Sequence, residues 1–177
     1  MINETYKAML KGKSIIRELS EYATARGKEI GYENVFDYSL GNPSVPCTED
    51  YTDTVIAMYQ NMNPMEIHGY SPSLGIESVR AAVAESLNRR FDMDYEAKHI
   101  FMTSGAAGAL AHAFRAVTKP GDEIITFAPC FPEYFPYVNT TGAVLKVVPA
   151  NTEDFQINFE EFEKMLNPKV MAVLINT

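Results

Sequence analysis

The sequence predicts an α/β fold with a mostly parallel sheet, helices on both faces of that sheet, and an N-terminal helical segment before it. From residue 98 onward, short β-prone apolar runs alternate with helical segments, as the strands of βαβ units do. Each run is almost continuously apolar, which is typical of strands covered on both faces. The four expected strands cover residues 99–103, 123–127, 143–148 and 170–175.

The first 30 residues predict two helical pieces on either side of a break at Lys11–Lys13. The second piece places apolar side chains on one stripe over residues 15–27. Residues 35–50 begin as a short extended run and continue as a loop rich in Gly and Pro. Two more helices are expected, one over about 51–61 and one, with a clear apolar stripe, over 76–91.

Three further helices are expected between the four strands. The first is an alanine-rich helix over 106–117, and the second is a short or irregular helix over 131–139. The third covers 158–166, where Asn158 is a good N-cap and Glu161 follows three residues later.

Composition and charge exclude several classes of protein. The chain has 177 residues, of which 46% are apolar and 21% are charged, so it can bury a sizeable core. A net charge of −8 without a basic run argues against nucleic acid or an anionic membrane as a partner. No apolar run approaches 18 residues, and residues 1–13 lack the apolar core of a signal peptide. We therefore expect neither a nucleic-acid nor a membrane partner.

The chain has only two cysteines, Cys47 and Cys130, which excludes a disulfide scaffold and favours a reducing compartment, the cytoplasm. Cys130 is either a reactive thiol in a loop or a small packed side chain. The three histidines, His68, His99 and His112, have no metal-ligand spacing among themselves or with the cysteines. No metal site is expected.

A turn of small residues, Thr103-Ser-Gly-Ala-Ala-Gly-Ala-Leu110, lies between an expected strand and an expected helix. Small side chains let a ligand approach the backbone closely, and the free N–H groups of a helix start attract an anion. The turn could therefore hold a phosphate group. The alternative is a tight strand-to-helix turn with alanine for close packing, because the segment is neither G-x-G-x-x-G nor contains a Walker lysine.

A second candidate segment, Ala128-Pro-Cys-Phe-Pro-Glu-Tyr134, follows the next expected strand. It would lie at the same carboxyl edge of a parallel sheet, where ligands of open α/β folds bind. Phe131 could stack there on a flat ring, or it could be a core aromatic. Tyr70, in a loop before a helix, indicates little by itself.

Taken together, five segments in a fixed order indicate more than each does alone. Their order and spacing over residues 15–177 resemble the N-terminal half of class I/II aminotransferases, which are pyridoxal-phosphate (PLP) enzymes with the type I (aspartate aminotransferase) fold. The resemblance implies that residues 1–48 are the N-terminal arm and part of the small domain. Residues 49–177 would be the first, truncated half of the PLP-binding large domain. The five segments are Leu40-Gly41-Asn42-Pro43, Tyr70-x4-Gly75-x3-Val79-Arg80, Thr103-Ser-Gly-Ala-Ala-Gly-Ala109, Pro120-Gly121-Asp122-Glu123 and Ala128-Pro-Cys-Phe-Pro-Glu-Tyr134.

The resemblance also implies residue roles. Gly105, Ala106 and Ala107 match the turn whose backbone amides hold the phosphate of PLP. Phe131 matches the aromatic that stacks on the pyridine ring. Tyr70 matches a tyrosine that reaches the phosphate bound by the other subunit, which implies a homodimer with shared active sites.

On the substrate side, Gly41 matches the glycine whose main chain lies near the substrate carboxylate, and Ile15 or Ile16 would belong to the segment that covers the substrate. Three family residues match no position in the chain: the Schiff-base lysine, the aspartate that pairs with the pyridine nitrogen and the arginine that binds the substrate carboxylate. Asn176 matches only the asparagine that opens the cofactor loop. No catalytic residue is therefore assigned, and the 177-residue chain is expected to be an inactive fragment of a longer enzyme.

The function implied by the resemblance is exchange of an amino group between an amino acid and a 2-oxo acid. One alternative is a catalytically inactive fragment that acts as a binding or dimerisation module. Another is a different type I PLP enzyme, such as a lyase, because the first-half motifs do not separate these reactions. A third is a small stand-alone βαβ domain that binds an unrelated phosphorylated ligand.

Overall fold

The chain forms two compact units, Met1–Gly69 and Tyr70–Thr177. The first of the two expected N-terminal helical pieces lies outside the described residues, apart from residues 4 and 7. The domain boundary expected after residue 48 stays a prediction. The computed structural model describes residues 4, 7, 14–41, 43–154 and 156–176.

The first unit consists of helices joined by loops. The described helix α2 confirms the second expected helical piece but continues past residue 27. Gly31 ends α2 with a φ of +89°, a backbone conformation that favours glycine. The elements of the first unit are α2 (Ile15–Ile30), the 3-10 helix η1 (Tyr32–Asn34), α3 (Glu49–Asn61) and α4 (Pro64–His68).

Helix α4 has no counterpart among the expected helices, because five residues are too few to show a period. Its start nevertheless has a local signal. The Asn63 side chain accepts a hydrogen bond from the Met65 backbone N–H at 2.9 Å, and Pro64 occupies the first turn.

The second unit contains the sheet and the remaining helices. None of the described helices in either unit is long and apolar enough to cross a membrane. In chain order the elements are α5 (Glu77–Phe91), the 3-10 helix η2 (Ala97–His99), α6 (Gly105–Val117), β1 (Glu123–Phe127), α7 (Tyr134–Asn139), β2 (Val144–Val148), α8 (Phe159–Met165) and β3 (Val170–Leu174).

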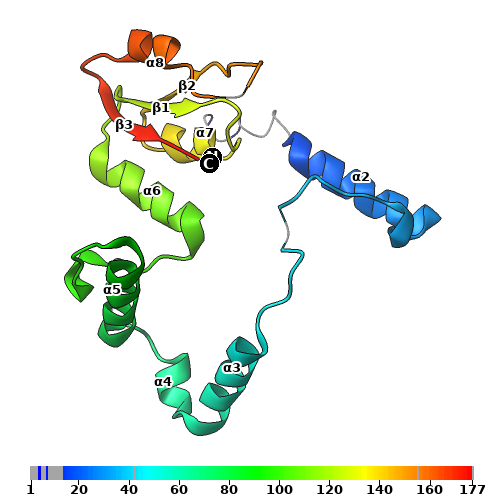
Figure 1. Cartoon of the computed structure of the whole chain (residues 1–177), viewed down its shortest axis with the longest axis vertical. Helices are drawn as coiled ribbons and strands as arrows, with labels where there is room; N and C mark the ends of the chain where they lie inside the picture. Colours follow the sequence, from blue (N-terminus) through cyan, green and yellow to red (C-terminus); the bar gives the residue numbers. More distant parts are fainter. Residues whose placement is uncertain (1–3, 5–6, 8–13, 42, 155, 177) are drawn as a thin grey trace. The chain divides into compact units, whose positions relative to one another are not determined.

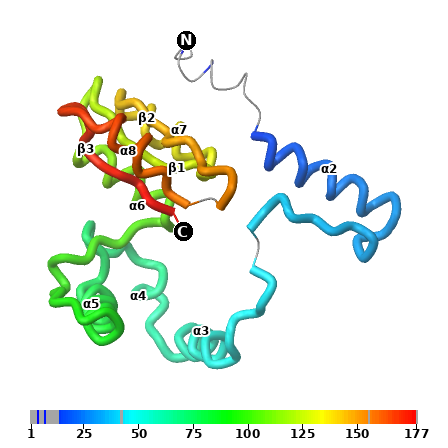
Figure 2. The backbone as a smooth tube through the Cα atoms, turned by 45° about the horizontal axis from the view of Figure 1, so that its top comes forward, coloured from blue at the N-terminus to red at the C-terminus, as the bar shows by residue number. Residues whose placement is uncertain are grey.

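The three strands form one parallel sheet in the order β2-β1-β3 (Figure 1). Ile124 of β1 lies opposite Leu145 of β2 on one side and Ala172 of β3 on the other. Figure 2 shows β3 beside β1, although α7, β2 and α8 separate them in the sequence. The predicted parallel sheet is confirmed, and the ends of these strands agree with the expected ends within one residue.

The expectation of a fourth strand over 99–103 is wrong. Residues 97–99 form η2, and residues 100–103 have no regular secondary structure. A strand exists only where a neighbour pairs with its backbone, and no described strand pairs with this segment. Its apolar, β-prone composition is a local signal, whereas pairing is decided by the rest of the fold.

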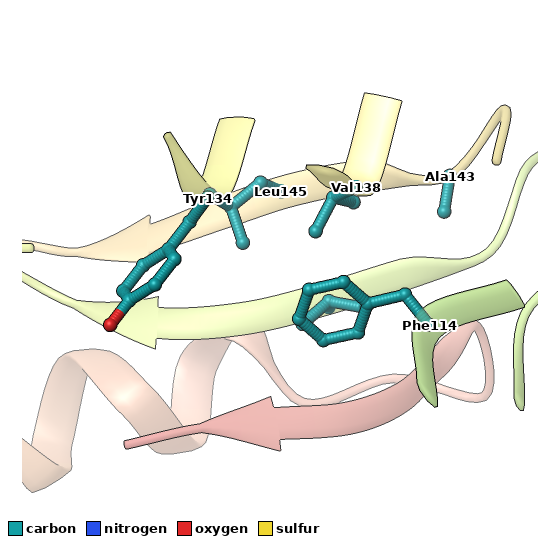
Figure 3. Close-up of a cluster of buried hydrophobic side chains, with 6 residues drawn as sticks. Phe114, Tyr134, Val138, Ala143 and Leu145 are labelled. Carbon is teal, nitrogen blue, oxygen red and sulfur yellow. The ribbon is translucent and has the colours of Figure 1, made fainter. Parts of the chain in front are cut away.

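Helices cover both faces of the sheet, as predicted. On one face of the sheet, Phe162 of α8 contacts Phe127 of β1 with ring centroids 5.4 Å apart. Successive side chains of a strand point to opposite faces, so Ile124 and Phe127 point to opposite sides of the sheet. Figure 1 shows α8 on one side of the sheet and α6 and α7 on the other. The main cluster, between the sheet and helices α6 and α7, consists of Phe114, Ile124, Tyr134, Val138, Ala143 and Leu145 (Figure 3).

Thr126 is a polar residue at the centre of the sheet, 1% exposed. Its Oγ1 donates a hydrogen bond to the backbone oxygen of Leu174 at 3.0 Å. A buried hydroxyl without a partner destabilises a fold, so this bond also helps to select β3 as the neighbour of β1. It ties the two strands together near their carboxyl ends, where ligands of open α/β sheets bind.

Candidate functional site

The turn that precedes α6 is closed by two local hydrogen bonds. The Thr103 Oγ1 donates to the Gly105 oxygen at 3.1 Å, and the Gly105 N–H donates to the Thr103 oxygen at 3.1 Å. Gly105 has a φ of +72°, which disfavours any side chain there. A Cβ at Gly105 would meet no atom within 4 Å, so the space beside this residue is open. The glycine is needed for its conformation and leaves room for a ligand.

The first turn of α6 offers backbone donors to that space. The N–H groups at a helix start have no intrahelical acceptor, and the Ser104 side chain makes no capping hydrogen bond. Because the Gly105 N–H is used within the turn, the free donors are those of Ala106 and Ala107, both of which are exposed. The first turn contains no acidic residue that would repel an anion. Free amides and the helix dipole together favour a phosphate at this position.

Phe131 follows β1 by four residues and does not belong to the buried core. It is 42% exposed, and its ring makes a T-shaped contact with the Tyr134 ring, with centroids 5.7 Å apart and planes at 76°. Tyr134 is 7% exposed and belongs to the main cluster. The core therefore supports one side of Phe131 and leaves part of the ring accessible, which favours a stacking role over a core role.

One core anchors both candidate segments. Leu110, on the second turn of α6, and Cys130, directly before Phe131, both pack against the cluster that contains Phe114 and Tyr134. The turn before α6 and the ring of Phe131 are therefore fixed to the same packed body. Burial raises the pKa of the Cys130 thiol, which lowers its thiolate fraction at neutral pH and favours the packed-thiol alternative.

A pocket of about 500 Å³ lies at the carboxyl edge of the sheet. Its lining comes from residues just after each of the three strands, including Ala128 after β1, Pro149 after β2 and Asn176 after β3. The position agrees with the general rule for open α/β sheets. No ligand is expected at Pro149 or Asn176 from the sequence, and the position of both residues just after strand ends is the signal that would have found them.

Tyr70 begins the second unit and is fully exposed. The loop that follows closes with a hydrogen bond from the Gly75 N–H to the Pro72 oxygen at 2.8 Å. The Tyr70 ring is therefore available to another molecule.

The two residues expected near the substrate belong to the first unit. Gly41 is exposed and a Cβ there would meet no atom within 4 Å, whereas Ile16 on α2 is half-buried and its neighbour Ile15 is exposed. The structure thus brings together Gly105, Ala106, Ala107 and, through the shared core, Phe131. Gly41 and Ile16 lie in a separate unit.

In the described part of the chain, no three His, Cys, Asp or Glu side chains gather as metal ligands would. The candidate chemistry of this site therefore rests on backbone amides, an aromatic ring and a tyrosine.

A parallel α/β sheet with a candidate anion site at a helix start is found in several classes of protein, and comparison with known families identifies the class. A family model, aminotransferase class I and II, matches residues 34–177, and the chain belongs to this family. The aspartate aminotransferase of Thermotoga maritima is 32% identical over 146 residues, which are 82% of this chain and 38% of that protein. The methionine aminotransferase of Escherichia coli is 30% identical over 109 residues, 61% of this chain and 28% of that one.

Among solved structures, an amino transferase from Eubacterium rectale is similar over 100% of this chain and 45% of its own length, with 42% identity and a TM-score of 0.92. The chain thus spans less than half the length of each of these relatives. The fold expected from the resemblance, the type I α/β fold with a parallel sheet, is confirmed.

Proposed function

We propose that this chain contributes the phosphate- and ring-binding half of the active site of a PLP-dependent aminotransferase, which exchanges an amino group between an amino acid and a 2-oxo acid. The observation that carries the proposal is the turn before α6, with its free amides at Ala106 and Ala107 and the open space beside Gly105. These features fit a phosphate dianion. The accessible ring of Phe131 fits the flat pyridine ring.

The bound cofactor supplies the electron sink that amino-group exchange requires. The task of this chain is to hold and orient it. Each charge-assisted hydrogen bond from Ala106 or Ala107 contributes about 1.5–3 kcal/mol, and stacking on Phe131 adds about 0.5–1.5 kcal/mol. Association entropy opposes these terms, so the chain alone is expected to bind PLP weakly. Contacts at both the phosphate and the ring fix the cofactor's orientation as well as its affinity.

The lysine, aspartate and arginine that the family resemblance requires match no position in the 177 residues. Because the chain spans less than half of its relatives' length, we propose that these residues belong to the part of those relatives that lies outside the match. No lysine of this chain is proposed as a catalyst.

The proposal includes a homodimer with shared active sites, in which Tyr70 reaches the phosphate of the partner subunit. The full exposure of Tyr70 supports this, because the side chain is not used within its own unit. Gly41 and Ile16 are proposed to contact the substrate from the N-terminal segment, within residues 1–48. A cytoplasmic location is also part of the proposal, supported by two free cysteines.

The first experiment tests the cofactor. The purified chain is titrated with PLP and with pyridoxal, which lacks the phosphate, and inorganic phosphate is added as a competitor. We expect tighter binding of PLP than of pyridoxal, and competition by phosphate against PLP alone. Equal affinities for the two compounds would contradict the phosphate-binding turn.

The second experiment tests the reaction. The protein is incubated with PLP and a panel of amino acids, with and without 2-oxoglutarate as acceptor. Transamination needs the acceptor, whereas a lyase forms its product without it. The 177 residues alone, which match no Schiff-base lysine, should form no product under either condition, so the reaction type is read from protein that also contains the lysine segment of the family.

A further inference from the structure

Arg80 is the only arginine among the described residues that is buried. It lies in the first turns of α5 and is 9% exposed. Its guanidinium binds two backbone oxygens: Nε donates to Gly75 at 3.2 Å and Nη1 donates to Ala97 at 2.5 Å. No carboxylate in the described part of the chain forms an ion pair with it. A buried cation is tolerated only where its donors are satisfied, so these two oxygens are structurally important.

The two oxygens belong to different segments of the candidate site. Gly75 ends the loop that begins at Tyr70, and Ala97 begins η2, which leads into the segment before the phosphate-binding turn. A planar guanidinium presents its donors in a fixed fork, so it sets the separation and angle of the two segments. A flexible ammonium could not hold both oxygens in the same way.

A second contact joins the same two segments. Gly75 has a φ of +88°, and a Cβ there would lie 2.6 Å from Cγ and 2.9 Å from Cβ of Met102. Only a glycine permits this approach. Met102 stands three residues before Gly105, so the loop that carries Tyr70 packs directly against the entry to the phosphate-binding turn.

We infer that Arg80 is a positioning residue that fixes the Tyr70 loop and the phosphate-binding turn relative to each other. The inference deepens the proposed function and rests on it. In the proposed dimer, Tyr70 serves the partner's phosphate and the turn serves the phosphate of its own subunit. Arg80 therefore aligns one contact at each of the two active sites, and its loss weakens the phosphate contacts of both.

The test compares Arg80→Lys with Arg89→Lys, a matched control at an exposed arginine of the same helix. The first readout needs no cofactor: hydrogen exchange of the backbone amides. We expect Arg80→Lys to raise exchange together in residues 70–75 and 100–107, and the control to change neither. Unchanged exchange in 100–107 overturns the inference, because the two segments are then not coupled through Arg80.

The second readout is the preference for PLP over pyridoxal. Loss of well-placed phosphate contacts should reduce this preference about tenfold in Arg80→Lys. If Arg80 had a merely structural role, Arg80→Lys would weaken the binding of PLP and of pyridoxal equally. The ratio of the two affinities would then stay unchanged, and this result would overturn the inference. If the wild-type chain shows no preference, the proposed function fails, whereas the exchange result still decides whether Arg80 couples the two segments.

Met102→Ala provides a second route, since Met102 is 41% exposed and its truncation is compatible with folding. If Arg80→Lys does not fold, this variant carries the test. It should also raise exchange in residues 70–75 and lower the preference for PLP over pyridoxal. Wild-type behaviour of Met102→Ala in both measurements would contradict the inferred coupling.

Discussion

The substitution Ala106→Asp places a carboxylate in the first turn of α6, at the position proposed for the phosphate. Ala106 is exposed and the turn contains no acidic residue, so the wild-type turn is open to an anion. An aspartate in the first turn of a helix is favourable by about 0.3–1 kcal/mol, because it interacts with the helix dipole. The fold should therefore be unharmed or slightly stabilised, while the phosphate site is blocked.

The magnitude follows from the two free amides. Charge-assisted bonds from Ala106 and Ala107 would contribute about 3–6 kcal/mol together. Because the turn is exposed and salt screens it, we take about half of this, about 1.5–3 kcal/mol, as the loss. That corresponds to a Kd for PLP raised roughly 10- to 150-fold.

The assay is a titration with PLP and pyridoxal at fixed ionic strength, together with thermal unfolding. Ala113→Asp is the matched control, since Ala113 is an exposed alanine of the same helix, two turns further on. Pyridoxal binding should be similar in all three proteins, and the Tm of Ala106→Asp should not fall. If Ala106→Asp binds PLP within twofold of wild type, or Ala113→Asp is equally weakened, the turn before α6 is not the phosphate site.

Three further predictions concern the body that supports the site. Thr126→Val removes the hydroxyl that donates to Leu174 and should lower the free energy of unfolding by about 1 kcal/mol in a denaturant titration. Asn158→Ala removes the cap of α8 and should lower it by about 0.5–2 kcal/mol in the same titration. Cys130, whose thiol pKa is raised by burial, should be alkylated more slowly at pH 8 than the exposed Cys47, because less of it is thiolate; unfolding in urea should remove the difference.

Each of these predictions has a control. Thr54→Val removes an exposed hydroxyl and should change stability by less than about 0.5 kcal/mol; an equal effect at Thr126 would mean that the bond to β3 contributes nothing. Asn158→Asp keeps a side-chain acceptor at the cap of α8 and should retain most of the stability that Asn158→Ala loses. Faster alkylation of Cys130 than of Cys47 in the folded chain would show that its environment activates the thiol.

Much of the fold was predictable because its signals are local. The ends of β1, β2 and β3 follow from compact apolar runs between turn residues, and the start of α8 follows from Asn158, whose side chain accepts a hydrogen bond from the Glu161 N–H at 3.1 Å. The run at 99–103 is also apolar and β-prone, and it is not a strand. No described strand lies beside it to pair with its backbone, which five residues by themselves cannot reveal.

The candidate site shows the same division. The sequence pattern by itself identified the turn at Gly105, because a segment of small residues between two regular elements can be recognised from the residue types alone. It left open whether Phe131 is a core or a stacking residue, and whether Cys130 is packed or reactive. Exposure favours one alternative over the other in each case, and exposure depends on what the rest of the chain places against a side chain.

Sequence by itself determined the family, the order of the three strands and of most of the helices, and the position of the glycine turn. These depend on residue type, spacing and backbone preference, which are properties of neighbouring residues. Only the tertiary structure decided the strand order β2-β1-β3, the use of the Gly105 N–H within its own turn, and the two oxygens that bind Arg80. Strand pairs, and the hydrogen bonds that satisfy a buried charge, form between residues that can be tens of positions apart. These interactions contribute to stability only once the chain has folded.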